Sequence, residues 1–189
     1  MLPPILIRAD RAGHRIQTEG SWNLNIIGVR SQQRDQSQDQ FDDVLHLVFK
    51  DHFEKWVTLS FPISTDPGLY WLKHGREAGT AILKAGQYKA WKLGKHKGLY
   101  PALVQHVGQV TIYRDRNKDD FIDMNEDTVI GGYYGINIHK SGLYSENIGR
   151  YSAGCQVFKS ELHFDIFMSF CRVYARLYQD EFTYTLLED

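Results

Sequence analysis

Only one long segment of the chain has the apolar spacing of an α-helix, and this feature constrains the fold most. Between residues 161 and 178, apolar side chains recur every three or four positions, after an N-cap residue at Ser160. Elsewhere the apolar residues come in short β-branched and aromatic runs parted by glycine, proline and charged residues. The pattern predicts an α+β fold that is mostly β, with one long helix near the C-terminus.

Composition and length agree with this prediction. The chain has 10 Phe, 11 Tyr and 4 Trp, which favour a β-rich core over a helical bundle. Its 189 residues suit a single domain spanning 1–189. The two cysteines, Cys155 and Cys171, are interpreted as free thiols, and Cys171 lies on the apolar side of the predicted helix.

Five local predictions follow from the order of residues. Segments 44–49 and 56–61 predict an antiparallel hairpin with one buried face, and 5–7 predicts a short strand. Residues 64–98, rich in Gly, Lys and Pro, predict loops with a short helix at 69–74. The polar segment 32–40 predicts a mobile hairpin connection, and the alternation at 182–186 predicts an edge strand.

Charge and hydropathy argue against several partners. The 22 Lys and Arg nearly cancel the 23 Asp and Glu, so no broad basic field would attract nucleic acid or anionic lipid. No stretch approaches the ~20 apolar residues of a membrane-spanning helix, so we expect no membrane insertion. Residues 1–10 lack the pattern of a secretory signal. We expect synthesis in the cytoplasm, with any work at a cell wall requiring release or signal-independent export.

Cys155 and His139 form the most informative pair in the sequence. A thiol attacks a carbonyl carbon as thiolate, which a neighbouring imidazole produces by taking the proton. His139 follows the β-type segment 133–138, and Cys155 follows Gly154, whose missing side chain lets a carbonyl approach backbone N–H groups. The structural alternative is that Cys155 is a small buried apolar residue and that His139 is a core or surface histidine with its hydrogen bonds made.

These residues carry a resemblance to a known family. The run Ile138-His139-Lys140-Ser141-Gly142, followed by Ser152-Ala153-Gly154-Cys155, resembles the signature of the L,D-transpeptidase catalytic-domain family. Residues 85–88 are similar to an upstream Gly-x-aromatic segment of that family, with less specificity. The motif region covers about 133–158, and the first 60 residues carry no resemblance.

The resemblance implies an L,D-transpeptidase-like β-sandwich or barrel and cysteine acyl transfer on peptidoglycan stem peptides, through a thioester and without a catalytic cofactor. It implies Cys155 as nucleophile, His139 as base and the Lys140 carbonyl as the group that orients His139. Gly154 and Cys155 would donate oxyanion N–H groups, within a motif that begins at Ser152. From their positions beside the motif, the expected substrate contacts are Asn137, Gly142, Arg150 and Tyr151.

One departure leaves other functions open. Ala153 stands where that family usually has a second histidine. A cell-wall peptide hydrolase or carboxypeptidase of the phage lysis type is one alternative. A calcium-stabilised binding module with an idle Cys–His pair is another, and the oligomeric state stays open.

The acidic run 115–126 matches a twelve-residue calcium-loop template. The template's oxygen ligands fall on Asp115, Asn117, Asp119, the Phe121 carbonyl, Asp123 and Glu126. Asp120 replaces the glycine usual at the sharp turn, and the flanks are of strand type. A structural calcium ion and a solvated acidic hairpin balanced by Arg114, Arg116 and Lys118 are both consistent with the sequence.

Overall fold

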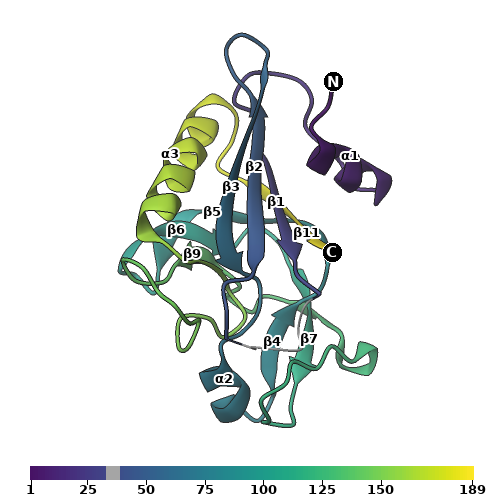
Figure 1. The fold of residues 1–189 in the computed structure, drawn as a ribbon, viewed down its shortest axis with the longest axis vertical. Helices are drawn as coiled ribbons and strands as arrows, with labels where there is room; N and C mark the ends of the chain where they lie inside the picture. Colours follow the sequence, from purple (N-terminus) through teal and green to yellow (C-terminus); the bar gives the residue numbers. More distant parts are fainter. Residues whose placement is uncertain (33–38) are drawn as a thin grey trace.

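The computed structural model describes residues 1–32 and 39–189, and most of the predicted mobile connection at 32–40 lies outside them. Eight strands close into a barrel in the order β1-β11-β5-β6-β9-β10-β3-β2 (Figure 1). Their bounds are β1 Asn25–Arg30, β2 Asp43–Lys50, β3 Trp56–Ser64, β5 Gly86–His96, β6 Tyr100–Gln105, β9 Ile138–Lys140, β10 Gln156–Phe158 and β11 Phe182–Glu188. The α+β, mostly β fold class predicted from the sequence is confirmed.

A second sheet and three α-helices complete the described chain. The sheet has the order β4-β7-β8, with bounds Thr80–Leu83, Val110–Asp115 and Ile130–Gly132. The helices are α1 Pro4–Arg11, α2 Leu69–His74 and α3 Glu161–Leu177, and a 3-10 turn η1 covers Glu126–Thr128. The predicted long C-terminal helix and the short helix at 69–74 are both confirmed.

The predicted hairpin is confirmed as β2 and β3. The two strands pair antiparallel along their whole length, from Lys50 opposite Trp56 to Asp43 opposite Ile63. In β3, Phe61 is buried and Val57 and Leu59 pack against the core. Their alternation with Thr58 and Ser60 therefore places one face of the hairpin inside the barrel.

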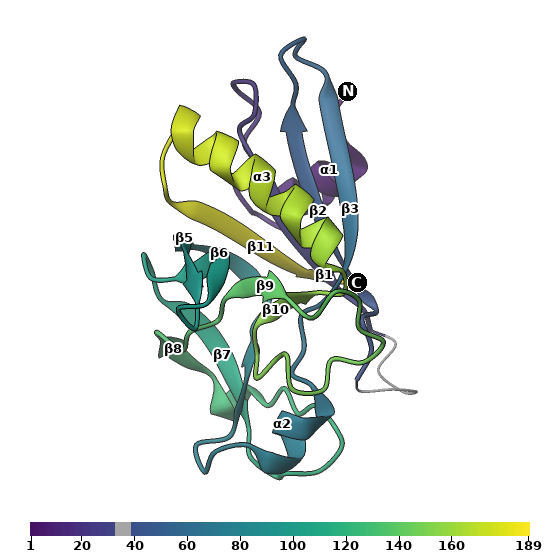
Figure 2. The same ribbon diagram turned by 90° about the vertical axis from the view of Figure 1, so that its left-hand side faces the viewer.

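The long helix α3 packs its apolar side into the same core. Phe164 and Phe167 meet Phe158 of β10 at ring-centroid distances of 5.4 and 5.0 Å. Cys171 is fully buried in this cluster, which agrees with its interpretation as a core thiol. Figure 2 shows α3 lying across the barrel, with its C-terminal end leading through a turn into β11. Ser160 precedes the helix, but its side chain makes no capping hydrogen bond.

Three local predictions are wrong. Residues 5–7 belong to helix α1, because Pro4 begins a turn that buries Leu6 and Ala9 against the outer side of the barrel. The stretch 64–98 contains β4 and the eleven-residue β5 besides loops. The last strand β11 is not an edge, because it pairs parallel with β1 and antiparallel with β5.

The two sheets share one apolar core. Ala81 and Leu83 of β4 and Ile112 of β7 belong to the cluster that fills the barrel. This contact brings β4 close to the segment that carries Cys155, as described below. Within the described residues, no helix combines the length and apolar character needed to cross a membrane.

Candidate active site

Two short parallel strands bring Cys155 and His139 to one face of the barrel. In the β9–β10 pair, Gln156 lies opposite Ile138 and Val157 opposite His139. Ile138 and Phe158 point into the core, so their neighbours His139 and Val157 point to the other face. Parallel strands lie about 4.8 Å apart and alternate residues about 6.6 Å apart, which puts the Cα atoms of Cys155 and His139 about 8 Å apart.

The Cys155 thiol is held by backbone groups. Its Sγ accepts a hydrogen bond from the Asn137 N–H at 3.4 Å, and the thiol donates to the Gly135 carbonyl at 3.5 Å. The residue is only partly buried and packs against Phe41, Ile148 and Val157. Cys155 thus differs from Cys171, which is enclosed in the core.

The His139 ring is oriented by a backbone carbonyl. Its Nδ1 lies 2.7 Å from the Lys140 carbonyl oxygen, which can only accept, so Nδ1 carries the proton and donates. The Tyr100 hydroxyl lies 3.2 Å from the same Nδ1 and donates to the Lys140 carbonyl at 3.3 Å. The lone pair is therefore on Nε2, which is buried and has no hydrogen-bond partner among the described residues. General-base chemistry requires such an unprotonated nitrogen within hydrogen-bond reach of the thiol, and in this structure no hydrogen bond joins Nε2 to Cys155.

Burial keeps both groups neutral. Desolvation, followed by the neighbouring His96, lowers the pKa of His139 to about 3. Desolvation raises the pKa of Cys155 to about 11, against the lowering effects of the Asn137 N–H and the Lys97 charge. The resting pair is a thiol and a neutral imidazole, so the proton would move as the sulfur attacks and not before.

Ser152 shapes the turn that presents Cys155. Its hydroxyl donates to the Cys155 carbonyl at 2.8 Å and accepts the Gly154 N–H at 3.2 Å. The side chain is fully buried, so its contacts are with the turn. The Gly154 N–H, expected as an oxyanion donor, is engaged by Ser152 in this structure. The Cys155 N–H has no acceptor among the described residues and is the better-placed donor.

Gly154 is required by both conformation and space. Its φ is +118°, in the region that side chains other than glycine rarely adopt. A Cβ at this position would lie 2.3 Å from the Ala81 carbonyl oxygen of β4. The second sheet is therefore in close contact with the turn directly before Cys155 and leaves no room for a side chain at Gly154.

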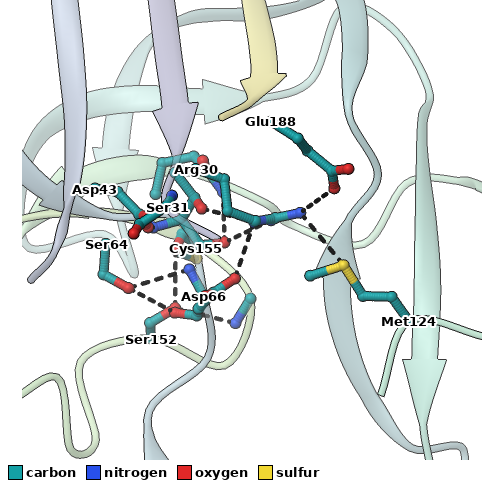
Figure 3. A network of polar contacts seen from close by, with 12 residues as sticks. Arg30, Ser31, Asp43, Ser64, Asp66, Met124, Ser152, Cys155 and Glu188 are labelled. Carbon is teal, nitrogen blue, oxygen red and sulfur yellow. Dashed lines mark hydrogen bonds and ion pairs between the residues drawn. The ribbon is translucent and has the colours of Figure 1, made fainter. Parts of the chain in front are cut away.

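A buried polar network lies beside the turn that carries Cys155 (Figure 3). The fully buried Arg30 donates to the Thr65 hydroxyl and carbonyl, and its Nε lies 3.0 Å from the Asp66 carboxylate. Asp43 accepts the Thr65 N–H at 2.6 Å, and Gln156 donates to the Thr65 carbonyl. Gln156 adjoins Cys155 in sequence, so this network fixes the backbone that carries the nucleophile.

The expected substrate contact Asn137 has a structural task. Its Oδ1 accepts the Gln105 N–H at 3.0 Å, and its Nδ2 lies 3.1 Å from His96 Nδ1. Both ends of the amide are thus engaged with the protein. Substrate contact by the Asn137 side chain stays a prediction, and it would use the second Nδ2 hydrogen, because the first is directed at His96.

The other expected contacts divide between two places. Tyr151 is exposed and lies near Tyr100. Burial raises the pKa of Tyr100 to about 12, and the charges of Cys155, Glu161 and Tyr151 contribute to this rise in that order. Gly142 lies against the Tyr151 hydroxyl. Arg150 points elsewhere, because its guanidinium stacks 3.9 Å from the Tyr70 ring centroid of α2.

Sequence reasoning missed His96. Its ring stacks on the His139 ring at a centroid distance of 3.9 Å and an interplanar angle of 22°. His96 ends β5, 43 positions before His139, and no motif or spacing in the sequence marks it. Only barrel closure, which pairs β5 with β6 and β6 with β9, brings the two rings together.

The acidic loop satisfies much of its own polarity. Asp115 accepts the Asp123 N–H, and Asp119 accepts the Phe121 N–H. Asn117 donates to both Asp119 and Asp123, with its Nδ2 at 2.9 and 2.6 Å from their carboxylate oxygens. Burial raises the pKa of Asp115, and the nearby carboxylates of Asp123 and Asp119 raise it further. The hydrogen bond from the Asp123 N–H opposes this shift in part.

The predicted closing ligand, Glu126, is engaged by residues outside the loop. Glu126 makes an ion pair with Lys84 and accepts the Tyr113 hydroxyl at 2.9 Å. No group of three or more His, Cys, Asp or Glu side chains in the described chain is arranged to hold a metal ion. Calcium binding at this loop stays a prediction that requires Glu126 to leave Lys84. Of the balancing cations expected in the alternative, Arg114 bonds to the Gly79 carbonyl and stacks on Tyr134.

Comparisons with protein-family models, with curated proteins and with solved structures each find no significant match.

Proposed function

We propose that the protein is a cysteine acyl-transfer enzyme that acts on peptidoglycan stem peptides, of the L,D-transpeptidase type. The observation that carries this proposal is the His139 ring, whose Nδ1–H is held by the Lys140 carbonyl while Nε2 stays buried and unpartnered. An unmade buried hydrogen bond costs about 1–3 kcal/mol. His163 also has one unpartnered buried nitrogen, but it belongs to α3, whereas His139 lies on the strand that pairs beside the Cys155 turn.

The proposed reaction has two steps. As Cys155 Sγ bonds to the carbonyl carbon of the donor peptide, His139 Nε2 takes the thiol proton and the Cys155 N–H binds the developing oxyanion. The carbon–nitrogen bond then breaks, and the imidazolium returns its proton to the leaving amine. The resulting thioester is attacked by an amine, which gives a cross-link, or by water, which gives a shortened stem. The choice of substrate class derives from the motif at 138–142 and 152–155.

The test uses purified muropeptides with the wild-type protein and its Cys155→Ala variant, with products read by mass spectrometry. New cross-links from the wild type alone would define a transferase, and shortened stems from the wild type alone a hydrolase. Cys171→Ala is the matched control for thiol removal, because that thiol is enclosed in the core. Unchanged muropeptides with every protein would refute the enzyme proposal and favour a binding module.

A further inference from the structure

His96 is a buried histidine with a defined tautomer, and the proposed reaction does not use it. Asn137 presents its Nδ2 to His96, because its Oδ1 already accepts the Gln105 N–H. The amide nitrogen can only donate, so His96 Nδ1 must accept and carries no proton. Desolvation, followed by the Lys97 charge, lowers the pKa of His96 to about 4. His96 is thus a neutral ring above that pH.

The contacts of His96 reach both members of the Cys–His pair. Its ring covers one face of the His139 imidazole at 3.9 Å. Its hydrogen-bond partner Asn137 donates a backbone N–H to Cys155 Sγ. The other groups near the two rings are Tyr100, whose ring centroid lies 5.6 Å from that of His96, and Lys97, whose charge lowers the pKa of both histidines. His96 is therefore tied to the base by stacking and to the nucleophile's strand by a hydrogen bond.

We infer that His96 is a positioning residue: its ring, fixed by Asn137, holds the His139 imidazole in the plane that directs Nε2 toward Cys155. The imidazole turns about its Cα–Cβ and Cβ–Cγ bonds, and the single hydrogen bond from Nδ1 to the Lys140 carbonyl restrains this turning only in part. A ring packed against the imidazole face blocks this rotation, and a neutral ring does so without competing for the proton that His139 receives. The catalytic part of this inference rests on the proposed function, whereas the ring contact does not.

Three substitutions separate the two contacts. His96→Phe keeps an aromatic face and removes the nitrogen that accepts from Asn137. His96→Asn offers an oxygen near the place of Nδ1 and removes the ring. His96→Ala removes both, and the exposed His52→Ala in the β2–β3 turn is the control.

We expect His96→Ala to lower kcat by about 10²-fold with KM unchanged within about twofold, since a misplaced catalytic group costs this much when binding is retained. His96→Phe and His96→Asn should each recover part of the loss, about tenfold. Equal loss in all three variants, with KM raised in parallel, would instead indicate a general structural role and overturn the inference. A wild-type rate in His96→Ala would do the same.

Nuclear magnetic resonance titration of His139 supplies a measurement that needs no substrate. In the wild type the nitrogen shifts should report a single tautomer protonated at Nδ1, with a pKa near 3. In His96→Ala they should report mixed tautomers and a pKa that rises toward 6.5, because water replaces the ring. Identical His139 signals in both proteins would overturn the inference. If no variant acts on muropeptides but these shifts occur, the proposed function fails while the positioning contact stands.

Discussion

The Cys155 site and the acidic loop both begin as sequence motifs, but they differ in how their polar atoms are used. The acidic loop bonds mainly to itself, to Tyr113 of the strand directly before it and to Lys84, which follows β4. The Cys155 site is built from β9, β10 and the end of β5, and it leaves one buried nitrogen of His139 unpaired. A local motif can satisfy its own groups, whereas a reactive atom is kept free only when several elements hold it in place.

The largest expected difference between the two regions is in the effect of a substitution on kcat, and it falls at His139. Asn can keep a bond to the Lys140 carbonyl but offers no basic nitrogen, so His139→Asn should lower kcat about 10³-fold through loss of the general base. The matched change in the acidic loop, Asp119→Asn, should leave kcat within about twofold, since it touches neither Cys155 nor His139. Muropeptide turnover measures both effects, and equal rates for His139→Asn and the wild type would contradict the assignment of His139 as general base.

The next largest effect concerns the turn before the nucleophile. Gly154→Ala should lower the free energy of unfolding by about 3 kcal/mol, because the added Cβ meets the Ala81 carbonyl in a strained backbone region. Gly13→Ala is the control, since Gly13 has a φ of +81° with nothing within 4 Å of an added Cβ, and it should cost about 1 kcal/mol. Urea denaturation measures both. Equal losses of unfolding free energy in the two variants would show that the Ala81 carbonyl does not exclude a side chain at Gly154.

The pH dependence of stability tests whether His139 is buried and neutral. Its pKa in the folded state, about 3, is below the ordinary 6.5, so its contribution to stability is complete above pH 6.5 and is lost as the pH falls. The wild type should therefore lose stability relative to His139→Asn by about 1.4 kcal/mol per pH unit between these values.

The wild type must be compared with His139→Asn because a second group, Asp43, changes stability with pH in the opposite direction. Burial, followed by Asp66, raises the pKa of Asp43 to about 7, so its contribution to stability increases as the pH falls. This contribution is the same in both proteins and cancels in their difference. A difference that does not vary with pH would mean that His139 is solvated.

The smallest expected effect is calcium binding by the acidic loop. Because Glu126 must first leave Lys84 and Tyr113, we expect an affinity near 1 mM and a rise in Tm of about 3 °C at 10 mM calcium chloride. Asp119→Asn should remove the rise, and EDTA should reverse it. If neither calcium nor EDTA changes the Tm, the loop is a solvated acidic hairpin that does not bind calcium.

Patterns that repeat within one element were the most predictable part of the fold. The spacing at 161–178 and the alternation at 57–61 reflect the geometry of a single helix and a single strand, so both elements were predicted correctly. Segment 5–7 was mistaken for a strand because three apolar residues are too few to define a period. The strands in 64–98 were missed because β5 mixes lysines and glycines with its buried residues and derives its place from pairing with β6 and β11.

The candidate site was predictable to the same extent. Cys155, His139 and Lys140 lie in two short motifs, and the contact between His139 and the Lys140 carbonyl is between neighbours in the chain. The use of the Gly154 N–H by Ser152 and of the Asn137 amide by Gln105 and His96 depends on side-chain directions that the motif does not specify.

The sequence by itself determined a mostly β chain with one long helix and a cysteine and a histidine sixteen residues apart, because these follow from residue type and local spacing. Only the tertiary structure decided that β11 closes a barrel, that the β4 carbonyl at Ala81 excludes a side chain at Gly154, and that His96 covers His139. These contacts join residues from 43 to 158 positions apart, and their energies depend on packing that no local pattern records.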